Sequence, residues 1–310
     1  MRLSKPLLQL PICFDGDKLA AEVNALPASA WLPHPTGFAG NEAVPFVAPG
    51  GKLGDGFEGA MGPTEHLGRC PYIMDMLAEL DSVWGRSRLM GLAPGADVPV
   101  HIDVHYYWRT HVRLHIPVIT NPGVLFTCNG ETVNMKAGEC WAFDSFSLHT
   151  VQNTGQERRV HLVLDTVGGE HLWDLVEAAT EGAKPVLWNG ESAVQRKPLA
   201  FEQINRPSVM SPWEIRRHID YVLDHAPRTE QTEAVAKRLD RFVSGWHGAW
   251  SQFGTSDQGL PTYRELIKRI RGDLISWNAQ EIVLQNEQPL GVTLDALILR
   301  NAVSPIPLPQ

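Results

Sequence analysis

The sequence predicts a mainly β protein that carries a helical part at its C-terminal end. Between Ser87 and Val167 the chain is a series of short apolar runs separated by turn residues. After Gly169 the apolar residues change to helical spacing. Hydrophobic residues make up 43% and charged residues 20%, which is ordinary for a globular protein. A chain of 310 residues can therefore bury one sizeable core, or one domain with an appendage.

The segment before the β region is predicted to hold two helices and a loop-rich stretch. Residues 17–26 (DKLAAEVNAL) and 71–84 (PYIMDMLAELDSVW) have apolar side chains at helical spacing. Residues 31–70 are rich in Gly and Pro, which favours loops and short edge strands.

Seven runs in the β region have the length and composition of strands. They are SRLMGL, DVPVHID, HVRLHIPVIT, GVLFTC, ECWAFD, HTVQN and RRVHLVLDTV. Turn signals such as Pro94-Gly95 and Asn129-Gly130 separate several of them. Many short strands at near-regular spacing are typical of a β-sandwich or barrel.

The C-terminal part is predicted to be helical. A helix is expected at 170–180, and a loop rich in Gly, Pro and Asn follows it. Three long helical stretches then follow. The first begins at Ser211, which forms a helix-capping pattern with Glu214 three residues later. The final SPIPLPQ indicates an extended tail. We expect a β domain with N-terminal helices and loops over residues 1–185, and a helical subdomain over 186–310.

His101, Asp103 and His149 are the most informative residues of the chain. In a His-x-Asp pair on an extended strand, both side chains point to the same face. His149 lies 46 residues beyond Asp103, on another expected strand. Two imidazoles and one carboxylate can occupy one face of an iron(II) octahedron and leave three positions open for a co-substrate and dioxygen. Together with the strand pattern, these ligands predict a double-stranded β-helix, a jelly roll of the cupin type.

Arg159 lies ten residues beyond His149 and shares a strand face with His161. An arginine there can hold the far carboxylate of 2-oxoglutarate with a planar, two-pronged hydrogen bond. Arg113 and His115 share a face of another run. Unpaired charge inside a small barrel is costly, and an anionic ligand in the lumen would offset it. The alternative is that these faces are solvated and both arginines are ordinary surface charges.

The stretch from Ser87 to Val167 resembles the aspartyl/asparaginyl β-hydroxylase family, which includes bacterial proline cis-4-hydroxylases. The matching segments are LAPGADVPVHID, HVRLHIPV, GECWAFDSFSLHTV and RRVHLVLDTVG. Their order follows the proline hydroxylase pattern closely. The resemblance does not extend to the C-terminal helices.

The resemblance implies that His101, Asp103 and His149 are the catalytic iron ligands. The vertebrate branch of the family lacks the metal carboxylate, so Asp103 places this chain nearer the bacterial small-molecule hydroxylases. In related oxygenases, loss of that carboxylate opens a position for halide. Its presence here favours hydroxylation over halogenation.

Four further roles follow from the resemblance. Arg159 matches the arginine that binds the C5 carboxylate of 2-oxoglutarate, and His115 matches a histidine that contacts this co-substrate. Arg113 matches an arginine near the co-substrate or the substrate carboxylate. Arg88 matches a basic position near the substrate.

The expected function is that of an Fe(II)- and 2-oxoglutarate-dependent dioxygenase that uses O2 to hydroxylate a free amino acid or a small amino-acid derivative. One alternative is hydroxylation of Asp, Asn or Pro side chains in a peptide or protein, and the sequence does not separate the two. Another is a cupin-like metal-binding or sensor protein without turnover. The spacing of Arg159 argues against this last class.

The composition limits the kinds of partner and the cellular compartment that we expect. The net charge of −8 argues against a broad surface for nucleic acid. No run of about 18 apolar residues exists, so no membrane span is expected. Four cysteines without a CxxC pair fit a reducing compartment, and we expect a cytoplasmic enzyme.

For two regions the sequence allows more than one role. The aromatic segment 105–108 can wall the substrate pocket or simply pack. The C-terminal helices can form a lid over a small substrate, a homodimer surface or a docking module for a protein.

Overall fold

The computed structural model describes residues 3–34, 37–190 and 198–304. The predicted C-terminal tail lies almost entirely outside these residues. No helix in the described part of the chain is long and apolar enough to cross a membrane.

The chain divides into two compact units. The first, here called the sheet unit, consists of Met1–Asp103 and Thr110–Asn205. The second, the helical unit, consists of Arg206–Gln310 together with the short segment Val104–Arg109. The chain therefore passes into the helical unit and back again in the middle of the β region.

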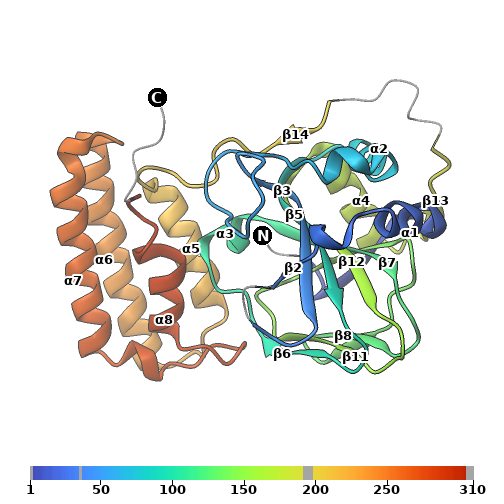
Figure 1. Ribbon diagram of the computed structural model, residues 1–310. Coiled ribbons are helices and arrows are strands. Elements are labelled where there is room, and N and C mark those ends of the chain that lie inside the picture. Colours follow the sequence, from blue (N-terminus) through green and yellow to red (C-terminus); the bar gives the residue numbers. More distant parts are fainter. Residues whose placement is uncertain (1–2, 35–36, 191–197, 305–310) are drawn as a thin grey trace. The chain divides into compact units, whose positions relative to one another are not determined.

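Ten strands form the larger sheet of the sheet unit within the described ranges (Figure 1). The main path runs β13-β1-β10-β7-β12-β5-β3-β2, while β14 pairs with β5 and β4 with β3. The strands are β1 (Leu7–Cys13), β2 (Leu32–Pro33), β3 (Asn41–Pro49), β4 (Met61–Pro63), β5 (Val83–Leu92), β7 (Val112–Ile119), β10 (Glu139–Phe143), β12 (Arg159–Gly168), β13 (Val186–Leu187) and β14 (Ala200–Phe201).

The smaller sheet has the order β6-β11-β8-β9. Its strands are β6 (Asp97–His101), β8 (Val124–Cys128), β9 (Glu131–Val133) and β11 (His149–Asn153). Asn129 and Gly130 join β8 to β9 with φ of 49° and 80°, the two positive values that a tight hairpin turn needs.

A buried apolar cluster joins the two sheets. It includes Leu92 and Phe143 from the larger sheet and Val124, Phe126 and Val151 from the smaller one. Two facing antiparallel sheets with their inner side chains packed together form a double-stranded β-helix. The predicted jelly-roll fold, mainly β with a helical C-terminal part, is confirmed.

Three helices belong to the sheet unit. They are α1 (Gly16–Asn24), α2 (Pro71–Glu79) and α4 (Glu170–Thr180), and the short 3-10 turns are η1 (Ala28–Ala30) and η2 (Leu67–Arg69). α1 packs against β7 and α4 against β1. Asp15 caps α1 by accepting hydrogen bonds from the backbone N–H groups of Asp17 and Lys18. These helices cover one face of the larger sheet, so the other face is free to line the site.

The helical unit is built on α5, α6 and α7. Its elements are α3 (Tyr106–Thr110), α5 (Pro212–Asp224), α6 (Glu230–Phe253), η4 (Asp257–Gly259), α7 (Leu260–Ser276), η5 (Ala279–Glu281), α8 (Leu290–Leu294) and the π-helical turn η6 (Asp295–Leu299). Trp246 is buried in this core, stacks near Tyr263 at 4.5 Å between ring centroids, and donates a hydrogen bond to the carbonyl of Met210. The predicted cap is confirmed, because Ser211 Oγ accepts from the N–H of Glu214.

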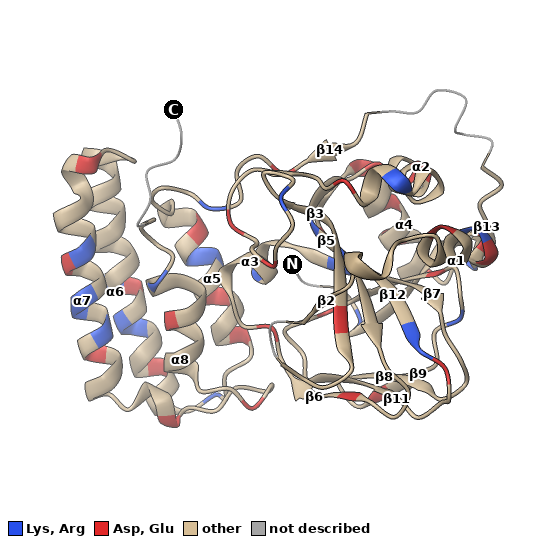
Figure 2. Ribbon diagram, in the orientation of Figure 1, with Lys and Arg blue, Asp and Glu red and all other residues tan. Residues whose placement is uncertain are grey.

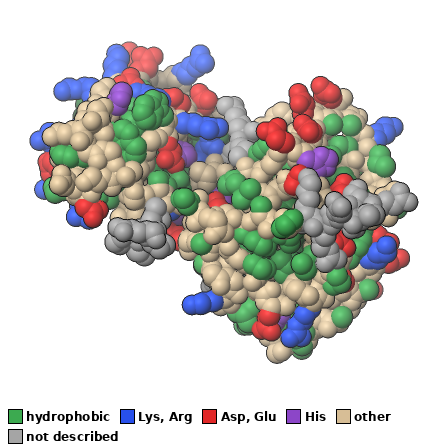
Figure 3. All heavy atoms as spheres, turned by 90° about the horizontal axis from the view of Figure 1, so that it is seen from above, with side chains coloured by type: hydrophobic (Ala, Val, Ile, Leu, Met, Phe, Trp, Pro, Cys, Tyr) green, Lys and Arg blue, Asp and Glu red, His purple; other side chains and the backbone are tan. Residues whose placement is uncertain are grey.

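Charges of both signs are mixed over the surface. Basic and acidic residues are mixed along α7 and along the first half of α6 (Figure 2). The face seen in Figure 3 also carries hydrophobic, basic and acidic side chains interspersed.

Two local predictions for the N-terminal region were wrong. The helix predicted over 71–84 ends at Glu79, because Asp81 adopts a φ of 43° and the chain turns into β5. β3 is a largely buried strand paired with β5 rather than a short edge strand. β1, an apolar run interrupted by prolines, was not predicted.

Candidate metal centre and its inner pocket

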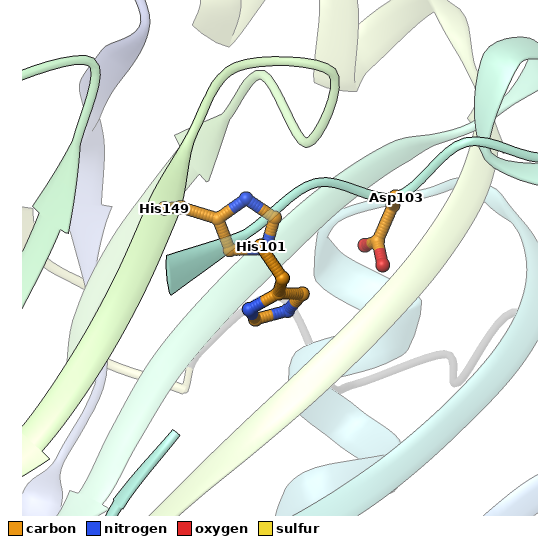
Figure 4. Close-up of side chains that lie close together, drawn as sticks. All are labelled: His101, Asp103 and His149. Atoms are coloured by element: carbon orange, nitrogen blue, oxygen red, sulfur yellow. The ribbon is translucent and has the colours of Figure 1, made fainter. Parts of the chain in front are cut away.

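His101, Asp103 and His149 converge at one place in the sheet unit (Figure 4). One ligand atom from each residue lies within 4.8 Å of the others. The cause is local, because His101 on β6 pairs directly with His149 on β11 in the antiparallel ladder. Asp103 follows β6 and is tied back by its N–H, which donates to the carbonyl of Ser145 at 2.9 Å. A divalent metal ion fits this donor set.

Both histidines are oriented by their backbone surroundings. Nδ1 of His101 lies 2.8 Å from the carbonyl of Pro99, and Nδ1 of His149 lies 2.9 Å from that of Ser147. Only a protonated Nδ1 can donate to a carbonyl, so in the neutral form of each ring Nε2 carries the lone pair. Burial lowers the pKa of His149 to about 4, despite the opposing charge of Asp103. His149 is therefore a neutral imidazole at ordinary pH, the form that binds metals.

Aromatic rings from both sheets pack against His149. The ring of His149 lies 5.1 Å from that of Phe143 and 6.3 Å from that of Phe126. His115 packs edge-on behind both, with centroids at 5.0 and 5.2 Å. His161 follows at 5.7 Å from His115. Uncharged rings therefore pack one against the next from His149 to His161.

Arg159, His115 and His161 form the inner end of the lumen, here called the histidine end. Arg159 is 4% exposed, and its Nε has no hydrogen-bond partner. Within the described ranges, no carboxylate forms an ion pair with Arg159. Burial alone lowers its pKa to about 9. Such a guanidinium has lost its hydration without gaining a counter-ion, a costly arrangement that an anionic ligand would relieve.

The two histidines of this end remain neutral. The pKa of His161 and that of His115 are both lowered well below the ordinary value, first by burial and then by the charge of Arg159. Both ring nitrogens of fully buried His161, and Nδ1 of His115, have no hydrogen-bond partner in the described structure. These rings are polar groups directed into the same buried space.

The other end of the same sheet face is an ionic cluster, formed by Arg86, Arg88, Arg113, Asp55 and Asp165. Arg113 donates from Nε and Nη2 to the two carboxylate oxygens of Asp165 at 2.7 and 3.2 Å. Arg88 forms an ion pair with Asp55, which comes from the glycine-rich loop after β3. Arg86 lies 3.8 Å from Asp165 and 3.7 Å from Asp55.

The ionic cluster reaches the metal ligands through Arg113. Its Nη1 donates to Oδ2 of Asp103 at 2.5 Å. Burial by itself raises the pKa of Asp165, but the charge and hydrogen bonds of Arg113 hold that pKa below its ordinary value. Asp165 is therefore an ionised anchor for the arginine that orients Asp103.

The structure brings the sequence-predicted residues together in one lumen. Arg159 and His115 lie at the histidine end, while Arg113 and Arg88 lie in the ionic cluster. Arg88 and Arg113 already have carboxylate partners, so their binding of a substrate or co-substrate stays a prediction.

Sequence reasoning missed several polar residues of the lumen. Asp165 shares the strand parity of Arg159 and His161, and this signal was available. Asp55 lies in a loop, and no pattern in the sequence predicts its place in the ionic cluster. The aromatic segment after Asp103 does not belong to the sheet unit but packs in the helical unit as α3.

Residues 58–168 match the family described as Aspartyl/Asparaginyl beta-hydroxylase. The resemblance seen in the sequence is confirmed for this segment. It contains the three candidate metal ligands and every other predicted site residue. The match therefore connects this lumen to a family of hydroxylases. No curated protein matches the chain.

Several solved structures are similar to parts of this chain. A 2OG-Fe(II) oxygenase family oxidoreductase from Burkholderia pseudomallei is 12% identical, with a TM-score of 0.34, and covers 55% of this chain and 96% of its own. A predicted oxalate decarboxylase from Thermotoga maritima is 26% identical, with a TM-score of 0.22, over 26% of this chain and 64% of its own length. The Schizosaccharomyces pombe Cnp3 cupin domain is 15% identical, with a TM-score of 0.23, over 31% and 61%. At these scores, the fold assignment depends on the strand order of the two sheets.

Proposed function

We propose that the protein is an Fe(II)- and 2-oxoglutarate-dependent dioxygenase that hydroxylates a free amino acid or a small amino-acid derivative. The observation that carries this proposal is Arg159. Its buried guanidinium has no counter-ion and lies behind a donor set of two histidines and one aspartate. A metal with an anionic co-substrate between it and an arginine matches this arrangement.

The three ligands suit iron(II) in particular. Two neutral imidazoles and one carboxylate form a facial set that leaves positions for co-substrate and dioxygen. When bound, the iron with 2-oxoglutarate supplies the oxidising chemistry, and the protein supplies orientation and a dry pocket. Arg113 holds Asp103 for this purpose, and the two backbone carbonyls hold the imidazoles.

Arg159 would receive the far carboxylate of 2-oxoglutarate. In a buried site, a bidentate arginine–carboxylate pair is strong and geometrically specific. His161 and His115 can donate to the same ligand from their neutral rings, since each has a nitrogen without a partner.

Charge balance supports an amino-acid substrate with a net charge of −1, such as one with an acidic side chain, because a zwitterion with a single carboxylate is neutral overall. In the lumen, Arg86, Arg88 and Arg113 face Asp55, Asp165 and Asp103, so these charges cancel. Iron(II) and the 2-oxoglutarate dianion also cancel each other. The positive charge that remains is that of Arg159, and a monoanionic substrate would neutralise the pocket. The nearly complete burial of Arg88 favours a small ligand over a bulky chain at this point.

The test is succinate release from 2-oxoglutarate with a panel of free amino acids, followed by mass spectrometry for the gain of one oxygen. We expect Arg159→Ala to abolish turnover at moderate 2-oxoglutarate. Arg158→Ala is the matched control, because its neighbouring guanidinium is half-buried and pairs with Glu42 outside the lumen. Turnover with peptides alone would replace the small-substrate proposal with protein hydroxylation. Metal binding without any succinate release would favour the sensor alternative.

A further inference from the structure

An open groove of about 770 Å³, here called the α7 groove, runs along one face of α7 in the helical unit. Its second wall is formed by the end of η6 and the residues that follow it. The residues that α7 contributes are spaced by three and four positions and so share one helix face. They are Arg264, Ile267, Lys268, Arg271, Gly272 and Ile275. Over this distance α7 advances about 16 Å, so the groove is as long as three turns of a second helix.

The walls of the α7 groove are apolar. Ile275 is 68% exposed. Ile267 lines the groove on the same helix, and Leu299 and Val303 line it on the other side. A single exposed isoleucine is ordinary, but apolar side chains gathered between polar ones mark a surface that binds a partner. A partner that covers these side chains removes them from water, which favours binding.

Gly272 lies in the α7 groove without a structural reason for a glycine. It is in the interior of α7, where a glycine costs stability relative to alanine. A Cβ at this position would meet no heavy atom within 4 Å, and the backbone does not adopt a positive φ. The packing of the helical unit therefore does not require the missing side chain. A partner that approaches the backbone of α7 closely does require it.

Basic side chains form the rim of the α7 groove. Arg271 donates from Nε to Oδ1 of Asp295 at 2.8 Å, and Arg300 donates from Nε to Oδ2 of the same carboxylate at 2.5 Å. Among the residues that the structure describes, Arg264 and Lys268 form no ion pair. Four basic groups thus share one carboxylate. The rim carries an excess of positive charge on a chain whose net charge is −8.

We propose that the α7 groove binds an acidic amphipathic helix of a partner protein. Helices bind in grooves through apolar residues spaced by three and four positions. Acidic residues beside these anchors would complement the rim. The chain's own residues 305–310 contain no acidic side chain. No aromatic residue on which nucleic-acid bases could stack is found among the described residues of the groove. This inference goes beyond the proposed function and does not depend on the metal site.

The experiment measures binding of a fluorescent synthetic peptide to the full chain by anisotropy. The peptide is an amphipathic helix with Leu at every third or fourth position and Glu on both flanks, and a second peptide has Lys in place of each Glu. We expect saturable binding of the Glu peptide only. Its affinity should fall at high ionic strength, because salt screens the charges of the rim. Equal affinity for the two peptides would overturn the proposal.

Two charge reversals on α7 test whether the peptide lies in the groove. Lys268→Glu should lower the affinity about 3- to 10-fold, because a basic group of the rim becomes acidic. Arg269→Glu is the matched control, since Arg269 is also exposed but does not line the groove and pairs with Glu265. Its affinity should stay close to that of the wild type. Equal losses in the two variants would mean that the peptide responds to net charge alone, and the groove would be wrong.

Two apolar positions separate binding from folding. Ile275→Asp places a charge among the apolar walls and should lower the affinity about 10-fold or more, with little effect on an already exposed site. Gly272→Leu should raise the unfolding temperature, because leucine favours a helix more than glycine does. The same side chain would fill the groove, so the affinity should fall. An unchanged affinity in a folded Gly272→Leu chain would overturn the proposal.

Other occupants of the α7 groove would give different results. If the peptide binds only a chain that ends at Ser304, the groove belongs to residues 305–310. If the chain self-associates in sedimentation and Ile275→Asp abolishes this association, a second copy is the occupant. If a single-stranded oligonucleotide displaces the peptide, the ligand is a nucleic acid. Each of these results would replace the acidic helix.

Discussion

The two ends of the lumen both bury arginine, yet they balance its charge in different ways. In the ionic cluster, Arg113 has Asp165 and Asp103 as partners, and Arg88 has Asp55. At the histidine end, Arg159 lies near the neutral rings of His115 and His161, and no ion pair to a carboxylate is found for it within the described residues. Both ends lie on neighbouring strands of one sheet, so the backbone does not explain the difference. A balanced arginine is part of the structure, whereas an unbalanced one is directed at a ligand.

The comparison predicts opposite stability effects for the same type of substitution. A buried ion pair is costly to break on one side, because the other charge stays buried without a partner. A buried charge without a partner costs stability as it stands, and its removal should be favourable.

The largest effect is expected for Asp165→Asn. It leaves Arg113 buried beside a neutral amide, and the free energy of unfolding should fall by about 3–5 kcal/mol. Urea unfolding measures this change. Asp240→Asn, which breaks an exposed pair with Arg216, should stay within about 1 kcal/mol of wild type. A loss for Asp165→Asn no larger than this control would contradict the structural role of the cluster.

Arg159→Met should have the opposite sign. The unbranched apolar side chain replaces a guanidinium without a counter-ion, so the ligand-free protein should gain about 1–3 kcal/mol of stability. Arg113→Met should lose stability in the same assay, because Asp103 would lose its ion pair and Asp165 would keep only the 3.8 Å contact with Arg86. If both variants were destabilised alike, the contrast between the two ends would not hold.

Added 2-oxoglutarate should stabilise only a protein with Arg159. At a ligand concentration of 100 times Kd, metal-loaded wild type should gain about 2.7 kcal/mol. Arg158→Met should gain as much, and Arg159→Met close to nothing at that concentration. Thermal shift assays with a redox-inert divalent ion measure this effect, and a full shift in Arg159→Met would place the co-substrate elsewhere.

The smallest change is expected for Asp55→Asn. The carboxylate is 40% exposed, so solvent already screens part of its pair with buried Arg88 and the loss of stability should be smaller than for Asp165→Asn. The variant should also change the activity. Arg88 would lose a counter-ion that competes with the substrate, so the KM for a carboxylate substrate should fall. An unchanged KM would remove Arg88 from the substrate site.

The strand alternation in the sequence predicted most of the lumen but not how its charges pair. Period-two spacing on β12 and β7 identified Arg159, His161, Arg113 and His115, because the pairing of β12 with β5 and that of β7 with β10 stay in register through these residues. Whether Arg113 pairs with Asp165 or with an anionic ligand depends on which residues lie opposite each other across the sheet. The pattern of a single strand does not contain that information.

Local geometry explains the other differences between sequence and structure. The helix before β5 ends at Asp81 in a left-handed conformation, without a Gly or Pro to mark the end. The packing of α3 against α5 joins residues more than a hundred positions apart, beyond the reach of any local motif.

The most direct test of the account is an anaerobic crystal structure with Fe(II) and 2-oxoglutarate. We predict one metal ion bound by His101, Asp103 and His149, with the far carboxylate of 2-oxoglutarate hydrogen-bonded to Arg159 and the ion pairs of the ionic cluster intact. A co-substrate held by Arg88 or Arg113, with Arg159 still lacking a partner, would contradict the account.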